Sequence, residues 1–398
     1  MTSVFPVWAQ SLRALIVRRE FRTDTITSRS GREQRRALRV TARKYLEFQA
    51  LVTGDLWRLL NTSMVFGQRT DWYFPDQSRV VSAPSGMPVG NSVTVSSAAA
   101  WLIDGAKVIL RDGSRLEVYT IFDVVGVTVT FVESASDDWP VDTLICPALL
   151  GWLGGEIAGQ ALRGVMIDLQ FSVEVDPTTE TTEPALAADA TFNGRDVWTL
   201  EPFAFRPAAI TYAQYREVVD ALMGPVSRFH PIARATRLWR AEFPMTDPDD
   251  EDRVRSFFEN MQGARGEFYM PTFEYDLEPK VASAAGSSTL RVSGTLTEET
   301  YSGSTTHRAV AVKYADGTIQ YNSVASMTTN AGDTVITFVD IWDQQVEVTD
   351  RVSWMPAWRF ATDILETQWL FDFGAPPTRW ATATPTLALL EDLGVESP

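Results

Sequence analysis

Apolar and polar residues alternate along much of this chain, and such a period of two is typical of β-strands that bury one face. The alternation is clear from Arg35 to Phe48, where positions such as Leu38 and Leu46 are apolar and the intervening positions carry most of the charge. We interpret this stretch as a half-buried strand with a basic outer face, preceded by a turn at Ser28–Gly31.

Two short segments have helical periodicity instead. In residues 247–263, Asp247 is a suitable N-cap and Gly263 a suitable C-terminal stop. Between them, four apolar residues recur at helical spacing and predict one buried stripe: Val254, Phe257, Phe258 and Met261. Residues 53–67 repeat this plan with Thr53 as the cap, Gly67 as the stop and a stripe of Leu56, Leu59 and Leu60.

These elements occur twice in the same order, about 200 residues apart, which indicates an internal duplication. Arg43–Phe48 and Leu238–Phe243 each precede a predicted helix, and an aromatic strand ending in proline follows it. Short strands come next, with favourable hairpin turns at Asp112-Gly113 and Asp316-Gly317. We expect Ile167–Val175 and Leu365–Phe373 to be the closing strands of the two copies.

The sequence therefore predicts a mainly β fold. It is a tandem duplication of a β-sandwich-like body with one short α-helix, and each copy carries a small β-barrel-like insert. The expected divisions are residues 1–85 plus 155–175 for the first body, 86–154 for the first insert, 176–190 for a linker, 191–275 plus 359–378 for the second body, 276–358 for the second insert and 379–398 for a C-terminal tail. The tail leucines predict either a short helix that docks on a partner or a loosely ordered terminus: Leu387, Leu389, Leu390 and Leu393.

Composition narrows the class of protein. The chain has 398 residues, of which 45% are hydrophobic, so two or three domains with real cores are expected. The formal net charge of −16 argues against general nucleic-acid binding, which needs a net basic face. No apolar run is long enough to span a membrane, and Met1–Gln10 lacks the charged and apolar regions of a secretion signal.

Candidate chemical groups are few. Cys146 is the lone cysteine and His230 and His307 are the only histidines, which excludes an intrachain disulfide, a thiolate zinc site and a three-histidine metal site. The acidic run Thr246–Asp252 fits a helix N-terminus better than a calcium loop, and Gly151–Gly159 lacks a phosphate-binding motif. We predict no catalytic residue, cofactor or metal, although a two-carboxylate glycosidase stays open.

The N-terminal region resembles the opening of tail-tip proteins of tailed bacteriophages, including the distal tail proteins of phages and gene transfer agents. In these proteins a Phe-Pro pair precedes a Ser-Gly-x-Glu-Gln-Arg turn and a basic strand. The matching positions here are Phe5, Pro6, Ser30, Gly31, Glu33, Gln34 and Arg35. Phe257–Phe273 is similar to the helix, glycine-rich turn and aromatic strand of the same proteins, through Gly263, Arg265, Gly266 and Phe268.

This resemblance implies a structural, non-enzymatic role at the tail tip or baseplate of a virion, in a protein made in the bacterial host cytoplasm. The protein would form a ring or hub that connects the tail tube to the baseplate or tail fibres and lets DNA pass. Its expected partners are further copies of itself, the tail tube protein, the tape measure protein and other baseplate, hub or fibre proteins. A receptor- or carbohydrate-binding tip protein and a tail-associated lytic hydrolase are the alternatives.

The basic stretch is the candidate subunit interface. In an acidic protein its natural partner is an acidic surface of a neighbouring subunit, and the alternative is a solvated strand face. The residues of this hypothesis are Arg32, Arg35, Arg36 and Arg39. Because each chain carries two bodies, three chains can close a ring with pseudo-six-fold symmetry; a hexamer in which one half forms the ring is the competing arrangement.

Overall fold

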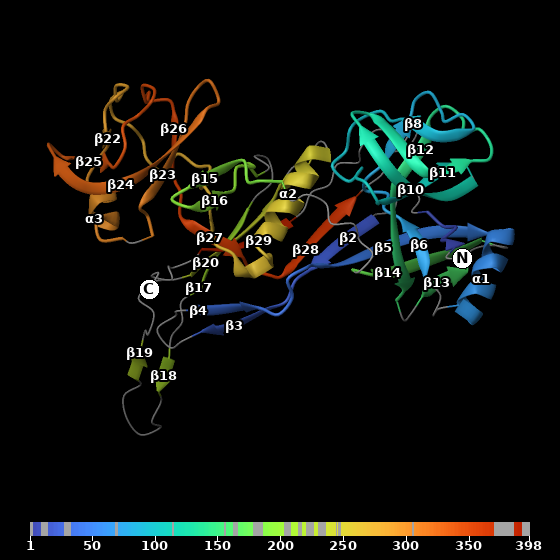
Figure 1. Cartoon of the computed structure of the whole chain (residues 1–398). Coiled ribbons are helices and arrows are strands. Elements are labelled where there is room, and N and C mark those ends of the chain that lie inside the picture. The colour runs from blue at the N-terminus through green and yellow to red at the C-terminus, as the bar shows by residue number, and fades with distance from the viewer. Residues whose placement is uncertain are drawn as a thin grey trace.

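The computed structural model describes residues 3–8, 15–27, 33–67, 71–113, 115–154, 157–161, 166–177, 186–202, 208–213, 217–219, 227–229, 236–243, 245, 248–304, 306–369 and 386–391. The chain is mainly β, as the alternation predicts, and consists of two bodies that each carry an insert (Figure 1). In Figure 1 both inserts lie above the bodies, at opposite ends of the molecule.

The first body is a mixed sheet with the strand order β2-β5-β14-β12-β6-β1. Neighbouring strands are antiparallel except for β1 and β6, which are parallel. Its strands are β1 (Ser3–Val4), β2 (Leu15–Glu20), β5 (Arg43–Thr53), β6 (Trp72–Pro75), β12 (Thr143–Leu153) and β14 (Met166–Val175). It also contains the hairpin of β3 (Thr23–Thr27) with β4 (Glu33–Ala37), the edge strand β13 (Ala158–Ala161) and helix α1 (Gly54–Gly67).

The second body repeats this order as β17-β20-β29-β27-β21-β16, and again only the last pair is parallel. Its strands are β16 (Arg195–Val197), β17 (Ala209–Ala213), β20 (Thr236–Glu242), β21 (Phe268–Tyr269), β27 (Ala357–Phe360) and β29 (Thr386–Glu391), with β15 (Ala190–Phe192) beside β16. A hairpin of β18 (Glu217–Val219) and β19 (Ser227–Phe229) takes the place of β3–β4, and α2 (Pro248–Asn260) is followed by the 3₁₀ turn η1 (Gly263–Arg265). The identical strand order confirms the predicted duplication.

The two inserts also share one topology. The first has the order β12-β9-β10-β11-β8 and the second β26-β23-β24-β25-β22, so corresponding strands follow one another in the same order in both inserts. Both carry a bulge at the same place, after Ile121 in β10 and after Val324 in β24. The strands are β7 (Val81–Ala83), β8 (Gly90–Thr94), β9 (Lys107–Asp112), β10 (Arg115–Val125), β11 (Thr128–Ala135), β22 (Thr289–Val292), β23 (Ala309–Lys313), β24 (Ile319–Asn330), β25 (Asp333–Phe338) and β26 (Arg351–Trp354), with helix α3 (Leu296–Tyr301) in the second insert.

The chain passes from insert to body without a loop in the first copy. Strand β12 pairs with β7 and β9 of the insert over Thr143–Pro147 and with β6 and β14 of the body further on. In the second copy the same stretch is divided into β26 and β27 at Met355-Pro356. The insert cores accordingly extend over Val81–Ile145 and Leu277–Trp354.

One strand leaves the second body and joins the first. Strand β28 (Ile364–Trp369) pairs antiparallel with β2, in a register from Leu15 opposite Trp369 to Glu20 opposite Ile364. The prediction that this segment closes the second body is wrong, because β29 fills that place between β20 and β27. Of the two alternatives for the tail leucines, the short helix is wrong for the same reason: Leu387 and Leu389 are buried at strand spacing in β29.

Both bodies share one hydrophobic core. A single cluster of buried residues includes Phe5 and Phe171 of the first body together with Trp198 and Phe360 of the second. Helix α2 lies between the bodies (Figure 1) and joins them through Phe258, whose ring centroid is 5.7 Å from that of Phe21 and 5.1 Å from that of Phe360. We therefore expect the two bodies to unfold as one cooperative unit.

The two helices agree with their predicted stripes to different degrees. The α2 stripe is confirmed, because Val254, Phe257, Phe258 and Met261 are all buried. Gly263 follows the helix with φ 67°, a conformation that glycine adopts without strain, whereas the predicted cap Asp247 lies outside the described residues. In α1 Leu60 is buried but Leu59 faces solvent, because the half-buried Trp57 packs on the core instead.

Candidate functional site

The described residues include no group of three or more His, Cys, Asp or Glu residues placed to hold a metal ion. His307 Nδ1 lies 3.4 Å from Ser304 Oγ and 3.1 Å from Thr306 Oγ1, but Ser304 is buried and the imidazole stacks against Tyr301. These contacts fix the loop after α3 and do not expose a nucleophile. His230 lies outside the described residues.

Cys146 is buried in β12, where its thiol lies 3.9 Å from the carbonyl oxygen of Ile109. Burial raises the pKa of this thiol well above its ordinary value. Because thiolate is the reactive form, Cys146 has the properties of a structural residue rather than of a nucleophile.

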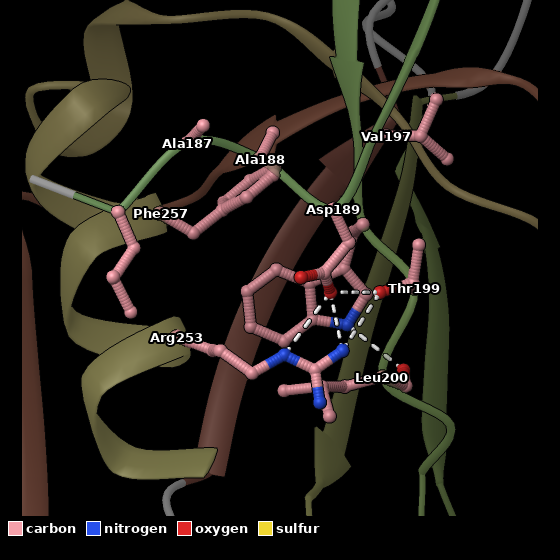
Figure 2. Close-up of a pocket in the computed structure, with 10 residues that line it drawn as sticks. Ala187, Ala188, Asp189, Val197, Thr199, Leu200, Arg253 and Phe257 are labelled. Atoms are coloured by element: carbon pink, nitrogen blue, oxygen red, sulfur yellow. Dashed lines mark hydrogen bonds and ion pairs between the residues drawn. The ribbon is translucent and has the colours of Figure 1, made fainter. Parts of the chain in front are cut away.

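A shallow hollow lies where the linker meets α2 (Figure 2). Asp189 accepts hydrogen bonds there from Arg253 and, at 2.7 Å, from Thr199 Oγ1. Burial by itself would raise the pKa of Asp189, but the hydrogen bonds from Arg253 and Thr199 outweigh it and lower that pKa. Because Asp189 and Arg253 neutralise each other, we interpret their ion pair as a structural cross-link between the linker and α2, and the hollow beside it as no binding site.

The basic stretch is two strands and not one. Residues 38–42 between β4 and β5 have no strand pairing in the structure. From Lys44 onward the predicted alternation holds, with Leu46 and Phe48 buried, but in β4 it is inverted and Arg36 is exposed. The inversion arises because β4 pairs only with β3, in a hairpin outside the sheet of the first body.

The arginines of the interface hypothesis therefore have different environments in the structure. Arg35 is largely buried and contacts Glu33 (Nε–Oε2, 3.0 Å) and Glu267 of the second body (Nη1–Oε1, 3.4 Å). Arg39 pairs with Glu20 at 3.4 Å. Both meet acidic groups as predicted, but within their own chain. Arg36 is exposed and stays a candidate for contact with another subunit, while Arg32 lies outside the described residues.

The two bodies meet at a junction, which we define as β2, β28, the turn 361–363 and α2. Asp363, in that turn, accepts hydrogen bonds from Thr23 N (2.5 Å), Thr23 Oγ1 (2.8 Å) and Ala264 N (2.9 Å). Its carbonyl oxygen accepts a further bond from Phe21 N at 2.9 Å. One residue thereby links the first body, the crossing strand and η1.

A buried ionic cluster covers the same junction. Arg79, in the loop after β6, pairs with Asp252 and with Glu251 (Nε–Oε2, 3.4 Å) at the start of α2. Arg255 bridges Asp252 and Glu259 at 3.1 and 3.3 Å. Arg19 of β2 completes the cluster with a 2.8 Å bond to Glu259. Removing a single partner from such a cluster leaves a buried charge uncompensated, so the cluster favours the observed position of α2 against the first body.

A second buried pair supports the first body behind this cluster. Lys44 Nζ is 2.7 Å from Asp76 Oδ2, and both side chains are buried. Burial opposes ionisation of Asp76, but the charges of Lys44 and Arg79 outweigh it and hold the pKa of Asp76 far below its ordinary value. By contrast, burial raises the pKa of Glu251 despite the nearby Arg79.

Sequence patterns missed most of this junction. The acidic run Thr246–Asp252 indicates a helix start, which accounts for its position but not for the burial of Glu251 and Asp252. Arg79 and Asp363 had no local pattern of their own. Asp363 directly precedes the alternating run of β28, so its position as a polar residue at the start of a predicted strand was the only available signal.

A polar clamp joins the second body to its insert. Glu201 accepts hydrogen bonds from Arg351 (2.6 and 3.2 Å) and from Lys313. These bonds, those from Arg351 first, lower the pKa of Glu201 to about 2 from its ordinary 4.5. The folded state therefore prefers charged Glu201, and the stabilisation is present above pH 4.5 and is lost as the pH falls toward 2.

We expect Glu201→Gln to lower the free energy of unfolding by about 1 kcal/mol at neutral pH, after allowance for partial exposure of the clamp. The difference from the wild type should shrink as the pH falls from 4.5 toward 2, because Glu201 is then protonated in the unfolded chain before it is protonated in the folded one. Urea denaturation of both proteins across this pH range measures it. A difference that does not change with pH would contradict the assignment.

No helix in the described part of the chain is long and apolar enough to cross a membrane. A scan of family models and a search of curated proteins gave no match to this sequence.

Proposed function

We propose that this chain is a structural component of a phage-type tail tip, where it forms a ring or hub that joins the tail tube to the baseplate or fibres. The observation that carries the proposal is the junction: two bodies of the same topology lie in one chain, and β28 joins one to the edge strand of the other. A repeated unit joined through a heterologous contact is the geometry from which closed rings are built. The resemblance of the N-terminal sequence to tail-tip proteins supports the assignment of this ring to a phage-type tail tip.

The duplication favours three chains per ring, with two bodies from each chain giving six similar positions. Such a protein would adapt a six-fold tube to three-fold parts below it. Its partners would be the tail tube protein, the tape measure protein and hub or fibre proteins. The net charge of −16 supports a lumen that DNA crosses without adhering, provided that the acidic groups line the inner wall.

Electron microscopy and native mass spectrometry of the purified protein test this proposal. We expect closed rings of tail-tube diameter with three copies each. Six copies per ring would refute the trimer while keeping the ring. A chain that stays monomeric and does not bind tail tube protein would refute the structural role.

A second candidate is contact with a receptor or glycan through the first insert. The hairpin of β10 and β11 exposes apolar side chains at its tip and flank, which supports a contact surface there: Phe122, Val125, Val127 and Val132. Glycan arrays and cell-surface binding assays with the full chain test it, and loss of binding in Phe122→Ser would assign the contact to this hairpin.

A further inference from the structure

Strand β17 is the last strand of the second body's sheet in the described part of the chain. It pairs with β20 on one side, from Ala209 opposite Arg240 to Ala213 opposite Thr236. All of its side chains are exposed, including Ile210 at 48% and Tyr212 at 66%. An edge strand with exposed large apolar side chains and no charge of its own is a ready partner for another strand.

The first body shows what covers this edge. Strand β2 has the place in its sheet that β17 has in the second body, and β28 lies along the outer edge of β2. The body that donates β28 also donates α2, which covers the junction through the Arg19–Glu259 pair and the Phe21–Phe258 contact. An edge of this type is thus covered by a strand and a helix that come from the neighbouring body.

The first body has the corresponding two elements at its far side. In chain order β28 lies between β27 and β29, and the matching segment between β12 and β14 contains β13. Strand β13 pairs with β14, and no other described strand pairs with it; Gly159 and Gln160 are exposed. The helix that matches α2 is α1, which exposes Leu59 at 54% and lies at the end of the molecule away from the second body (Figure 1).

We propose that the β17 edge binds the first body of a second copy of this chain, with β13 of that copy along β17 and its α1 over the contact. The contact between copies then uses the elements that correspond in chain order to β28 and α2, while β13 keeps its pairing with β14 of its own body. It is head to tail, so every copy has one donor face (α1 and β13) and one acceptor face (β17), and repetition closes a ring or continues as a filament. This inference specifies the contact between copies in the proposed ring. It rests on the proposed function only for the statement that the multimer closes into a ring.

Surface substitutions on each face test the contact without disturbing the core. The acceptor variant carries Ile210→Lys with Tyr212→Lys, and the donor variant carries Leu59→Lys with Gln160→Lys. A control variant, Tyr275→Lys with Val281→Lys, places the same charges at similarly exposed sites (63% and 53%), one just before the second insert and one within it. All three should keep the wild-type circular dichroism spectrum and urea midpoint.

Native mass spectrometry is expected to give multimers for the wild type and the control, and single copies for the acceptor and donor variants. Self-association of each variant should weaken by about tenfold or more. A mixture of acceptor and donor variants should give dimers of one copy each and nothing larger, because that pair retains one intact contact. This complementation distinguishes a head-to-tail contact from a general loss of solubility.

Three results would overturn the inference: a monomeric wild type, an acceptor variant that assembles normally, or mixed variants that remain single copies. They are distinguishable from failure of the proposed function. Rings that persist in both variants would keep the ring and refute this contact. A monomeric wild type that still binds tail tube protein would keep the tail-tip role and refute self-assembly through β17.

Discussion

Replacing Arg79 with methionine is expected to lower the free energy of unfolding by about 3–5 kcal/mol, the usual cost of removing one partner from a buried ion pair. Methionine retains most of the apolar stem of Arg79 but none of its charge. Asp252 would keep Arg255, whereas Glu251 would lose the one partner that the structure gives it within 4 Å among the described residues. The 13 tryptophans provide a fluorescence signal for urea denaturation.

The matched control is Arg115→Met. Arg115 also pairs with a carboxylate, Glu117 at 2.9 Å, but on the surface of the first insert, where such a pair contributes about 1 kcal/mol or less. A cycle of Arg79→Met, Asp252→Asn and the double variant then isolates the coupling between the two side chains. If Arg79→Met costs no more than Arg115→Met, the cluster does not hold α2 against the first body.

The duplication could be predicted from sequence because its signals are local. Hairpin turns such as Asp112-Gly113, the periodicity of α2 and the alternation of β5 each depend on residues close together in the chain. The fate of β28 could not be predicted in this way. Its period of two correctly indicates a strand, but alternation does not specify which edge a strand joins, and β2 lies about 350 residues away along the chain.

The same limit explains the C-terminal strand and the arginines. The spacing of the tail leucines Leu387, Leu389 and Leu390 fits a short helix as well as a strand. They form a strand because this segment pairs with β20 on one side and with β27 on the other. For Arg35, charge correctly predicts an acidic partner but not that Glu267 of the same chain supplies it. Local patterns therefore predicted the elements, whereas their pairing across the two halves, which forms the junction, required the structure.

Asp363→Ala is expected to lower the free energy of unfolding by about 3 kcal/mol. The substitution removes the carboxylate that accepts three hydrogen bonds. The backbone N–H groups of Thr23 and Ala264 then lose this acceptor. Because these bonds hold the turn into β28, amide hydrogen exchange should accelerate in β2 and β28 more than in the inserts. Urea denaturation and hydrogen exchange measured by mass spectrometry together separate a local from a global effect.

Asp316→Ala is the matched control, since Asp316 also accepts bonds from a backbone N–H and a hydroxyl, both of Thr318, but in an exposed hairpin turn. It should lower the free energy of unfolding much less than Asp363→Ala does, because Asp316 is solvent-exposed, and it should leave exchange in β2 unchanged. Asp363→Asn should be intermediate, because its amide retains one acceptor oxygen. Equal exchange in β2 for Asp363→Ala and the wild type would mean that β28 holds its place by strand pairing alone. Faster exchange in β2 would mean that the crossing strand depends on its anchor, and a strand supplied to β17 by another copy would then need an anchor of its own.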